Sequence, residues 1–269
     1  ECACYNSTIW LHLLGEPFLN SNIFEMIKYS REKHIKKIGL STNGTFLDKN
    51  IAKKILDSGI TRLECSVDAV DNQSYKEMRN SDDYDDLVNN IRYLLQLKKD
   101  LKIKYPVVSI QFVKMKKSDK FLKDSLSQWK NCLNDEDFIM TIEYSSFAGQ
   151  LKNPKELASV YKNKEDERKP CGWLWKGTVV LYNGDVTICG GDYDGKSVLG
   201  NIKNQSLKSI WEGEQYNNLR RLHVERQYSN CGLCSTCDEW MYGDGSRYEN
   251  VLKKNDLQSI ANLNYNAQA

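Results

Sequence analysis

Apolar and polar positions in the first half of the chain alternate between short apolar runs and longer amphipathic stretches. The apolar runs have the length and composition of strands that are buried on both faces. In the stretches between them, apolar residues recur at three- and four-residue spacing with charged residues in between, as in helices that pack on a sheet. The predicted strands span residues 8–14, 37–41, 62–67, 107–113 and 138–143, and the predicted helices span residues 23–33, 49–58, 84–97 and 118–132. This order predicts an α/β fold with a mostly parallel sheet.

The pattern changes after residue 144. Residues 145–170, and residues 162–169 above all, are polar and charged enough to form a linker. Beyond them, apolar residues flank Asn183-Gly184, a pair that predicts a tight hairpin because both residues tolerate a positive φ. We therefore expect a core domain over residues 1–150, a linker over 151–170, a small hairpin-plus-helix domain over 171–250 and a tail over 251–269.

Composition and charge narrow the class of protein. The 269 residues include 38 Lys and Arg against 36 Asp and Glu, and no long block of one sign is present to follow a nucleic-acid backbone. No apolar run reaches the roughly 18 to 20 residues that span a bilayer, and no leader peptide opens the chain. We expect a cytoplasmic protein that has neither nucleic acid nor a membrane as its partner.

Nine cysteines are many for such a chain, and five of them fall within residues 171–237. Three of the five form two overlapping CxxC steps, Cys231-Gly-Leu-Cys234-Ser-Thr-Cys237. Thiolates at this spacing can converge on one metal centre, and both a structural zinc site and a 4Fe–4S cluster take four such ligands. A disulfide framework suits a small secreted domain better than this chain. The cysteine spacing alone does not decide between a zinc site, an iron–sulfur cluster and a purely structural role for these cysteines.

Three polar motifs follow successive predicted strands. They are Gly15-Glu16-Pro17, Ser41-Thr42-Asn43-Gly44 and Ser66-Val67-Asp68. Each motif alone is also an ordinary turn. Because ligands bind at the carboxyl ends of parallel strands, the three motifs together predict one polar pocket above an apolar sheet.

With these motifs, the sequence resembles the radical S-adenosylmethionine (SAM) enzymes that carry a C-terminal SPASM or twitch domain. The resemblance rests on residues 10–20 (WLHLLGEPFLN), 41–48 (STNGTFLD), 66–68 (SVD), 75–79 (YKEMR), 183–189 (NGDVTIC), 199–201 (LGN) and 206–211 (SLKSIW). It implies a partial (β/α)6 barrel followed by a small SPASM/twitch domain with a β-hairpin and a helix. It also implies two 4Fe–4S clusters in the complete protein and SAM as cofactors.

The chain departs from this family at its first residues. The family's cluster loop is CxxxCxxC, whereas this sequence opens Glu1-Cys2-Ala3-Cys4. Only ten residues separate Cys4 from Gly15, and five strands are predicted where the family has six. We infer that the sequence contains only part of the natural chain. By the resemblance, Cys2 is the last ligand of the SAM cluster, and Cys4 is the alternative.

The resemblance also implies roles for the strand-end residues. Gly15, Glu16 and Pro17 would meet the amino group of the SAM methionine moiety. Ser41 and Asn43 would line the SAM pocket, and Ser66 would lie near the ribose. Arg79 matches an arginine that pairs with the SAM carboxylate, a contact that a planar guanidinium makes with two hydrogen bonds.

For the auxiliary 4Fe–4S cluster, five cysteines compete for four places. In related domains a basic helix precedes the final CxxC at a regular interval, and counting 14 residues from Arg220 gives Cys234. The expected ligands are Cys171, Cys189, Cys234 and Cys237, with Cys231 as the alternative. Cys65 and Cys132 are interpreted as buried thiols, and Cys65, just before Ser66, as the nearer of the two to the pocket. His12 and His34 are interpreted as packing or surface residues, and His223 lies on the basic helix without a partner at metal-site spacing.

The function implied by the resemblance is that of an oxidoreductase. A 5′-deoxyadenosyl radical would abstract a substrate hydrogen, and the auxiliary cluster would accept an electron. The substrate would be a sugar or cyclitol alcohol or a peptide side chain, and a flavodoxin or ferredoxin would be the electron donor. Two alternatives stay open: a redox-neutral epimerase or peptide-crosslinking enzyme, and a zinc-bearing binding module without catalytic activity.

Overall fold

The computed structural model describes residues 1–114, 127–151, 168–240 and 248–253. These residues form two compact units. One unit comprises Cys2–Ile142 and residues 249–253, and the other comprises Glu1 and Glu143–Tyr248. Among the described helices, none has both the length and the apolar composition needed to cross a membrane.

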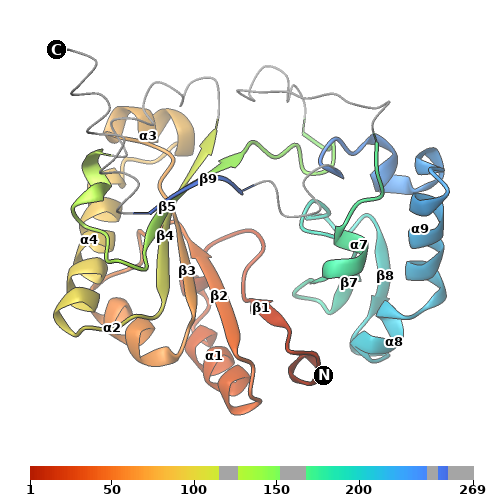
Figure 1. Cartoon of the computed structure of the whole chain (residues 1–269), viewed down its shortest axis with the longest axis horizontal. Coiled ribbons are helices and arrows are strands. Elements are labelled where there is room, and N and C mark those ends of the chain that lie inside the picture. Colours follow the sequence, from red (N-terminus) through yellow and green to blue (C-terminus); the bar gives the residue numbers. More distant parts are fainter. Residues whose placement is uncertain (115–126, 152–167, 241–247, 254–269) are drawn as a thin grey trace. The chain divides into compact units, whose positions relative to one another are not determined.

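The first unit is built on a six-stranded sheet with the strand order β1-β2-β3-β4-β5-β9 (Figure 1). The strands are β1 (Thr8–Trp10), β2 (Lys37–Thr42), β3 (Arg62–Ser66), β4 (Val107–Lys114), β5 (Phe138–Glu143) and β9 (Tyr248–Lys253). The pairs β1–β2, β2–β3 and β3–β4 are parallel. The carboxyl ends of these four strands therefore lie along one edge of the sheet, where parallel sheets bind ligands.

Helices cover one face of this sheet (Figure 1). They are α1 (Ile23–Glu32), α2 (Lys49–Ser58), α3 (Asn72–Arg79) and α4 (Tyr84–Asp100), and the short 3-10 helices η1 (Cys2–Tyr5) and η2 (Pro17–Leu19) flank β1. Side chains alternate between the two faces of a strand. On β3, Leu63 and Cys65 are fully buried in the core, so Glu64 and Ser66 point to the opposite face. That face is free to carry polar groups.

Helix α4 continues to Asp100, beyond the end predicted at residue 97. The reason is Lys98, whose side chain is fully buried and forms an ion pair with the buried carboxylate of Asp137. Asp137 also accepts a hydrogen bond from the backbone N–H of Val108 at 2.8 Å. Lys98 and Asp137 therefore connect the last turn of α4 to the beginning of β4. In the sequence, a charged residue at position 98 instead suggests that the amphipathic helix has ended.

Other elements differ from the sequence prediction at their ends or in their existence. Strand β1 ends at Trp10 rather than at residue 14, and β2 to β5 lie within one residue of their predicted bounds. Helix α3 was not predicted, although Asp71 and Ser74 form a capping box at its start. Strand β9 was not predicted because its sequence does not alternate. The predicted helix over residues 118–132 lies mostly outside the described residues.

The described residues of the second unit form a three-stranded sheet and helices α7, α8 and α9 around a smaller core (Figure 1). Its elements are α7 (Trp173–Lys176), β6 (Val179–Val180), β7 (Asp185–Thr187), β8 (Val198–Asn201), α8 (Leu207–Trp211), α9 (Glu214–Val224) and the 3-10 helices η4 (Tyr228–Asn230) and η5 (Gly232–Thr236). The strands pair antiparallel in sequence order. The core contains Leu174, Val186, Ile188, Leu199, Ile210 and Tyr216.

The hairpin at Asn183-Gly184 exists, but its turn differs from the predicted one. Gly184 has a φ of +93°, whereas Asn183 is not among the residues with a positive φ. The N–H of Gly184 donates to the carbonyl of Leu181 at 2.9 Å, and the N–H of Leu181 donates to the carbonyl of Asp185 at 2.8 Å. This is a three-residue loop closed by a glycine in the left-handed region, so only one residue needs a positive φ.

Asp48→Ala is expected to lower the free energy of unfolding by about 1 kcal/mol. The Asp48 carboxylate caps α2 by accepting the N–H groups of Asn50 at 2.8 Å and Ile51 at 2.7 Å. Denaturant unfolding of the wild type and the variant measures the loss. Asp57→Ala is the control, because it makes the same change at an exposed position near the other end of the helix. Equal losses in both variants would contradict the capping role.

Candidate functional site

Glu16 joins the loop after β1 to the end of β2. Its carboxylate accepts hydrogen bonds from the Thr42 hydroxyl at 2.9 Å and from the backbone N–H of Asn43 at 2.8 Å. It also accepts the backbone N–H of Phe18 at 3.1 Å, which caps helix η2. A carboxylate has about four acceptor positions. Three protein donors therefore fix the carboxylate at the strand end and still leave it capacity for a cation.

Ser41 and Asn43 are half-buried at the end of β2. The backbone N–H of Ser41 donates to Nδ1 of His12 at 3.0 Å. Burial lowers the pKa of His12 to about 4, so the ring is neutral and can accept at this nitrogen. The side-chain oxygen of Asn43 accepts from the N–H and the hydroxyl of Thr45 at 3.0 and 2.8 Å. His12 thus has a polar role at the site that the sequence interpretation missed.

Ser66 is the last residue of β3, and Asp68 follows the strand at the same edge of the sheet. Asp68 is buried and has a φ of +58°, a left-handed conformation that is uncommon outside glycine. Its carboxylate accepts the backbone N–H of Val113 at 2.6 Å and forms an ion pair with Arg79. Arg79, at the end of α3, is therefore brought to the strand ends with a carboxylate partner already in place. Its side chain is 38% exposed, so other guanidinium donors remain accessible to a ligand.

The four cysteines of the first unit differ in exposure, and Cys132, which was expected to be a buried thiol, is only partly buried. Cys2 lies in η1 and packs partly buried against the core, whereas Cys4 is exposed. Cys65 is fully buried in the core on the helix-covered face of β3, and burial raises the pKa of its thiol. Cys65 thus points away from the face on which Ser66 lies. The Glu16 charge adds to the raised pKa of this thiol, so Cys65 lies within electrostatic range of the Glu16 carboxylate although the core encloses it.

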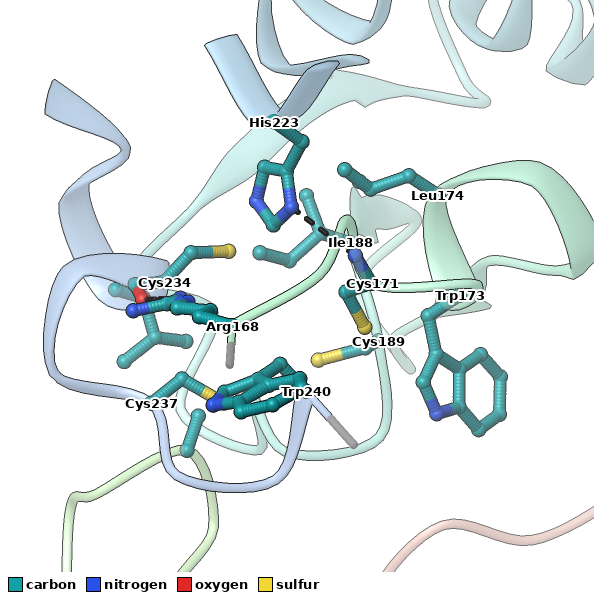
Figure 2. Close-up of a pocket in the computed structure, with 12 residues that line it drawn as sticks. Arg168, Cys171, Trp173, Leu174, Ile188, Cys189, His223, Cys234, Cys237 and Trp240 are labelled. Carbon is teal, nitrogen blue, oxygen red and sulfur yellow. Dashed lines mark hydrogen bonds between the residues drawn. The ribbon is translucent and has the colours of Figure 1, made fainter. Parts of the chain in front are cut away.

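In the second unit, the four cysteines Cys171, Cys189, Cys234 and Cys237 line one pocket (Figure 2). Cys171 immediately precedes the turn into α7, Cys189 follows β7, and η5 brings Cys234 and Cys237 to the same pocket. Residues from three separate segments therefore surround a single space.

Cys231 is buried but does not line this pocket. Its thiol donates to the carbonyl of Gln227 at 3.5 Å. The Cys231 thiol therefore has a hydrogen-bond partner only four residues away in the sequence.

The segment after Cys237 is held by residues that follow β5. The Ser145 and Ser146 hydroxyls donate to the carboxylates of Glu239 and Asp238. Gly149 has a φ of +81°, and a Cβ there would lie 2.5 Å from the carbonyl oxygen of Thr236. The close approach of the two backbones therefore requires glycine at position 149.

Backbone N–H groups face three of the four sulfur atoms. Glu239 donates to Cys237 Sγ at 3.3 Å, and Trp173 and Gly191 donate to Cys171 and Cys189. Burial above all, with a contribution from neighbouring thiols, nevertheless raises the pKa of Cys189 and of Cys234 to about 12. Four thiolates together need a positive centre to replace their protons, and metal ions of a cluster supply one.

Apolar side chains complete the lining of the cysteine pocket. Within the described residues, no group of three Cys, His, Asp or Glu side chains converges closely enough to hold one metal ion. The thiols instead surround a space together with apolar side chains such as Leu174, Ile188 and Trp240. A zinc site brings its sulfur ligands to about 2.3 Å from one centre, whereas a 4Fe–4S cluster occupies the space between thiolates that stand farther apart.

His223 and Arg168 also line the cysteine pocket (Figure 2). His223 is fully buried, and its Nδ1 accepts the backbone N–H of Cys171 at 3.2 Å. Burial, and then the nearby Arg168 charge, lower the pKa of His223 to about 4. The sequence interpretation missed both residues, because His223 lies on a basic helix without a spacing motif and Arg168 falls within the predicted linker.

Comparisons with known proteins agree with this geometry. The family model of the radical SAM superfamily matches residues 8–115, and that of the SPASM iron–sulfur cluster-binding domain matches residues 171–238. A probable GTP 3′,8-cyclase of Methanocaldococcus jannaschii is 27% identical over 157 residues, which cover 57% of this chain and 49% of that protein. A probable GTP 3′,8-cyclase of Sulfolobus acidocaldarius is 25% identical over 70% of this chain and 63% of its own length. The chain thus spans about half the length of the first of these relatives.

Solved structures share the fold at low sequence identity. BtrN in complex with AdoMet and 2-DOIA aligns over 93% of this chain and 81% of its own, with 17% identity and a TM-score of 0.55. Streptococcus suis SuiB bound to S-adenosylmethionine aligns over 88% of this chain and 62% of its own, with 14% identity and a TM-score of 0.58. The predicted partial barrel with a small C-terminal domain is confirmed. The chain belongs to the radical SAM superfamily and carries a SPASM domain, so that SAM and 4Fe–4S clusters, rather than zinc, are its cofactors.

Proposed function

We propose that the protein is a radical SAM oxidoreductase whose auxiliary 4Fe–4S cluster accepts an electron from the substrate. The observation that carries this proposal is the set of four cysteines around one pocket (Figure 2). Four thiolates provide one ligand for each iron of a 4Fe–4S cluster, so no iron is left open for a substrate. A closed cluster is suited to electron transfer.

In this proposal Cys171, Cys189, Cys234 and Cys237 hold the auxiliary cluster, and the N–H groups of the surrounding loops orient their sulfur atoms. Cys2 is the ligand that this chain contributes to the SAM cluster. Its partly buried position beside the first core gives it a more defined place than the exposed Cys4 has.

The strand-end residues would bind SAM. Gly15, Glu16 and Pro17 would receive its ammonium group, because the Glu16 carboxylate is held in place and retains acceptor capacity. Ser41 and Asn43 would line the pocket beside it, and Ser66 would lie near the ribose. Arg79 would bind the SAM carboxylate with the donors that its ion pair with Asp68 leaves accessible.

Oxidation of a C–H centre removes a hydrogen atom, an electron and a proton from the substrate. When bound, SAM and its cluster supply the 5′-deoxyadenosyl radical that takes the hydrogen atom, and the auxiliary cluster takes the electron. The proton leaves to solvent. The substrate would be a sugar or cyclitol alcohol or a peptide side chain, and a reduced flavodoxin or ferredoxin would supply the electron that starts each cycle.

A second candidate is a redox-neutral reaction. The sequence relatives named GTP 3′,8-cyclases favour it, and GTP is therefore a substrate to test directly. Epimerisation and peptide crosslinking are further reactions of this class. They differ from dehydrogenation in what happens to the electron after the hydrogen atom has been removed.

The test uses the anaerobically reconstituted full-length protein with SAM, dithionite and either GTP or an extract of metabolites and peptides. Mass spectrometry of parallel reactions in H2O and D2O identifies the product. Dehydrogenation gives a product that is two hydrogens lighter than its substrate in both solvents. An epimer of unchanged mass in H2O that gains deuterium in D2O, or a cyclised GTP, would contradict the proposal.

Cys65→Ala is expected to leave turnover within about twofold of the wild type. The Cys65 thiol is buried in the core on the helix-covered face, so it is not placed to return hydrogen to a substrate radical. Product formation and the thermal midpoint are measured together, because the small cavity costs about 1 kcal/mol of stability. Loss of product with continued SAM consumption in a folded variant would favour a hydrogen-donor role and a redox-neutral reaction.

A further inference from the structure

Two buried nitrogen atoms in the cysteine pocket have no hydrogen-bond partner among the residues that the structure describes. They are Nε2 of His223 and Nε of Arg168. Both residues line the pocket formed by the four cysteines. A buried N–H group without an acceptor is costly, and most such groups in folded proteins are paired. The two atoms therefore point to an acceptor that belongs in this pocket.

The hydrogen position on His223 follows from its other contact. The backbone N–H of Cys171 donates to Nδ1 at 3.2 Å, which requires a lone pair on that nitrogen. In the neutral ring the hydrogen then lies on Nε2. An edge contact with Tyr228, at 5.4 Å between ring centroids, holds the ring. Figure 2 shows the free edge of the imidazole turned toward the side of the pocket that carries Cys234.

Arg168 is fixed by the loop that carries a proposed ligand. Its terminal nitrogens donate to the carbonyls of Cys234 and Ser235. Its guanidinium lies over the ring of Tyr228, 4.2 Å from the centroid. These contacts use the two terminal nitrogens, and the buried Nε–H of this pocket-lining residue has no acceptor among the described residues. Tyr228 therefore supports both unpaired donors.

We propose that the His223 Nε2–H and the Arg168 Nε–H donate hydrogen bonds to sulfur atoms of the auxiliary cluster and raise its reduction potential. This inference rests on the proposed function, because it requires a cluster at the four cysteines. Reduction adds negative charge to the cluster, and donors to its sulfur atoms stabilise the more negative state. The positive charge of Arg168 acts in the same direction. Both residues thus make the cluster a better electron acceptor.

The test is an EPR-monitored redox titration of the anaerobically reconstituted full-length protein. His223→Phe keeps an aromatic ring but removes the donor, and it is expected to lower the potential of the auxiliary cluster. The expected shift is about tenfold in the ratio of reduced to oxidised cluster at a fixed potential, or about 59 mV for one electron. His223→Gln restores a donor and an acceptor, and it is expected to recover most of the shift. Arg168→Met is expected to lower the potential as well.

Arg221→Met is the control for a general effect of charge. Arg221 lies on the same helix as His223, but it is exposed and paired with Glu225. Its substitution is expected to leave the potential unchanged. If His223→Phe is unstable, His223→Gln and Arg168→Met still test the proposed hydrogen bonds. A wild-type reduction potential in Arg168→Met overturns the role of Arg168. A reduction potential in His223→Gln far below that of the wild type overturns the role of His223.

Iron content separates this inference from the proposed function. A sample with about eight irons and two EPR signals contains both clusters. Unchanged potentials in all His223 and Arg168 variants of such samples contradict the inference alone. If Cys234→Ala retains both signals, the ligand assignment itself is wrong.

Discussion

Replacing Cys234 by alanine is expected to remove the auxiliary cluster and abolish product formation, while slow uncoupled cleavage of SAM continues. Cys234 is one of four cysteines that line a single pocket, and its loss leaves only three thiolates there. The iron content of the reconstituted full-length protein should fall from about eight to about four per chain. SAM cleavage survives because the strand-end site lies in the other compact unit.

Cys231→Ala is the matched control for this variant. Cys231 lies three residues earlier in the same motif, but its thiol donates to the Gln227 carbonyl and does not line the pocket. The control should retain about eight irons and full activity. Iron and sulfide analysis, together with assays for 5′-deoxyadenosine and product, compares the two variants. The opposite pattern would exchange the roles of the two cysteines.

Replacing Glu16 by glutamine is expected to weaken SAM binding by about tenfold to over a hundredfold. The change removes the negative charge that would face the SAM ammonium, and a hydrogen bond to a charged group contributes roughly 1.5 to 3 kcal/mol. The amide oxygen can still accept from Thr42 and from the Asn43 N–H. The fold and the brown colour of the iron–sulfur protein should therefore persist.

Equilibrium binding of SAM under anaerobic conditions measures the effect. Glu25→Gln makes the same chemical change at an exposed position on α1 and should leave SAM affinity unchanged. Thr42→Val removes the hydroxyl that orients the Glu16 carboxylate, and a smaller loss than that of Glu16→Gln is expected. Unchanged affinity in Glu16→Gln would remove Glu16 from the SAM site.

The sequence predicts most of the first unit because periodicity is a local signal. The five strands from β1 to β5 and the helices α1, α2 and α4 lie close to their predicted positions. The exceptions depend on partners that are distant in sequence. Lys98 extends α4 because Asp137 is buried beside it, and β9 is a strand through its place beside β5. Neither contact changes the spacing of apolar residues within its own segment, so the sequence pattern does not predict it.

In the candidate sites too, short sequence motifs could be predicted, whereas contacts between residues that are distant in sequence could not. Gly15-Glu16-Pro17 and the cysteine motif are visible as short patterns in the sequence. The roles of His12 and Asp68 are not, because they depend on the backbone N–H groups of Ser41 and Val113. His223 is the clearest case, since only the folded chain reveals that its second nitrogen is buried and unpaired.

The cysteine pocket changes what can be inferred from the CxxC spacing. Spacing alone allows one zinc ion or one iron–sulfur cluster. In the folded chain Cys171 and Cys189 join Cys234 and Cys237 around a space, while Cys231 turns to a carbonyl of its own segment. This arrangement supports the proposed closed cluster, which would serve as the electron acceptor in the proposed dehydrogenation.

The most direct test of radical chemistry by this protein is the release of 5′-deoxyadenosine. The full-length protein, reconstituted under anaerobic conditions, is incubated with SAM and dithionite, and the nucleoside is quantified by mass spectrometry. We predict that 5′-deoxyadenosine forms only when protein, SAM and reductant are all present. A preparation with about eight irons that binds SAM but releases none, with or without a metabolite and peptide extract, would contradict the account.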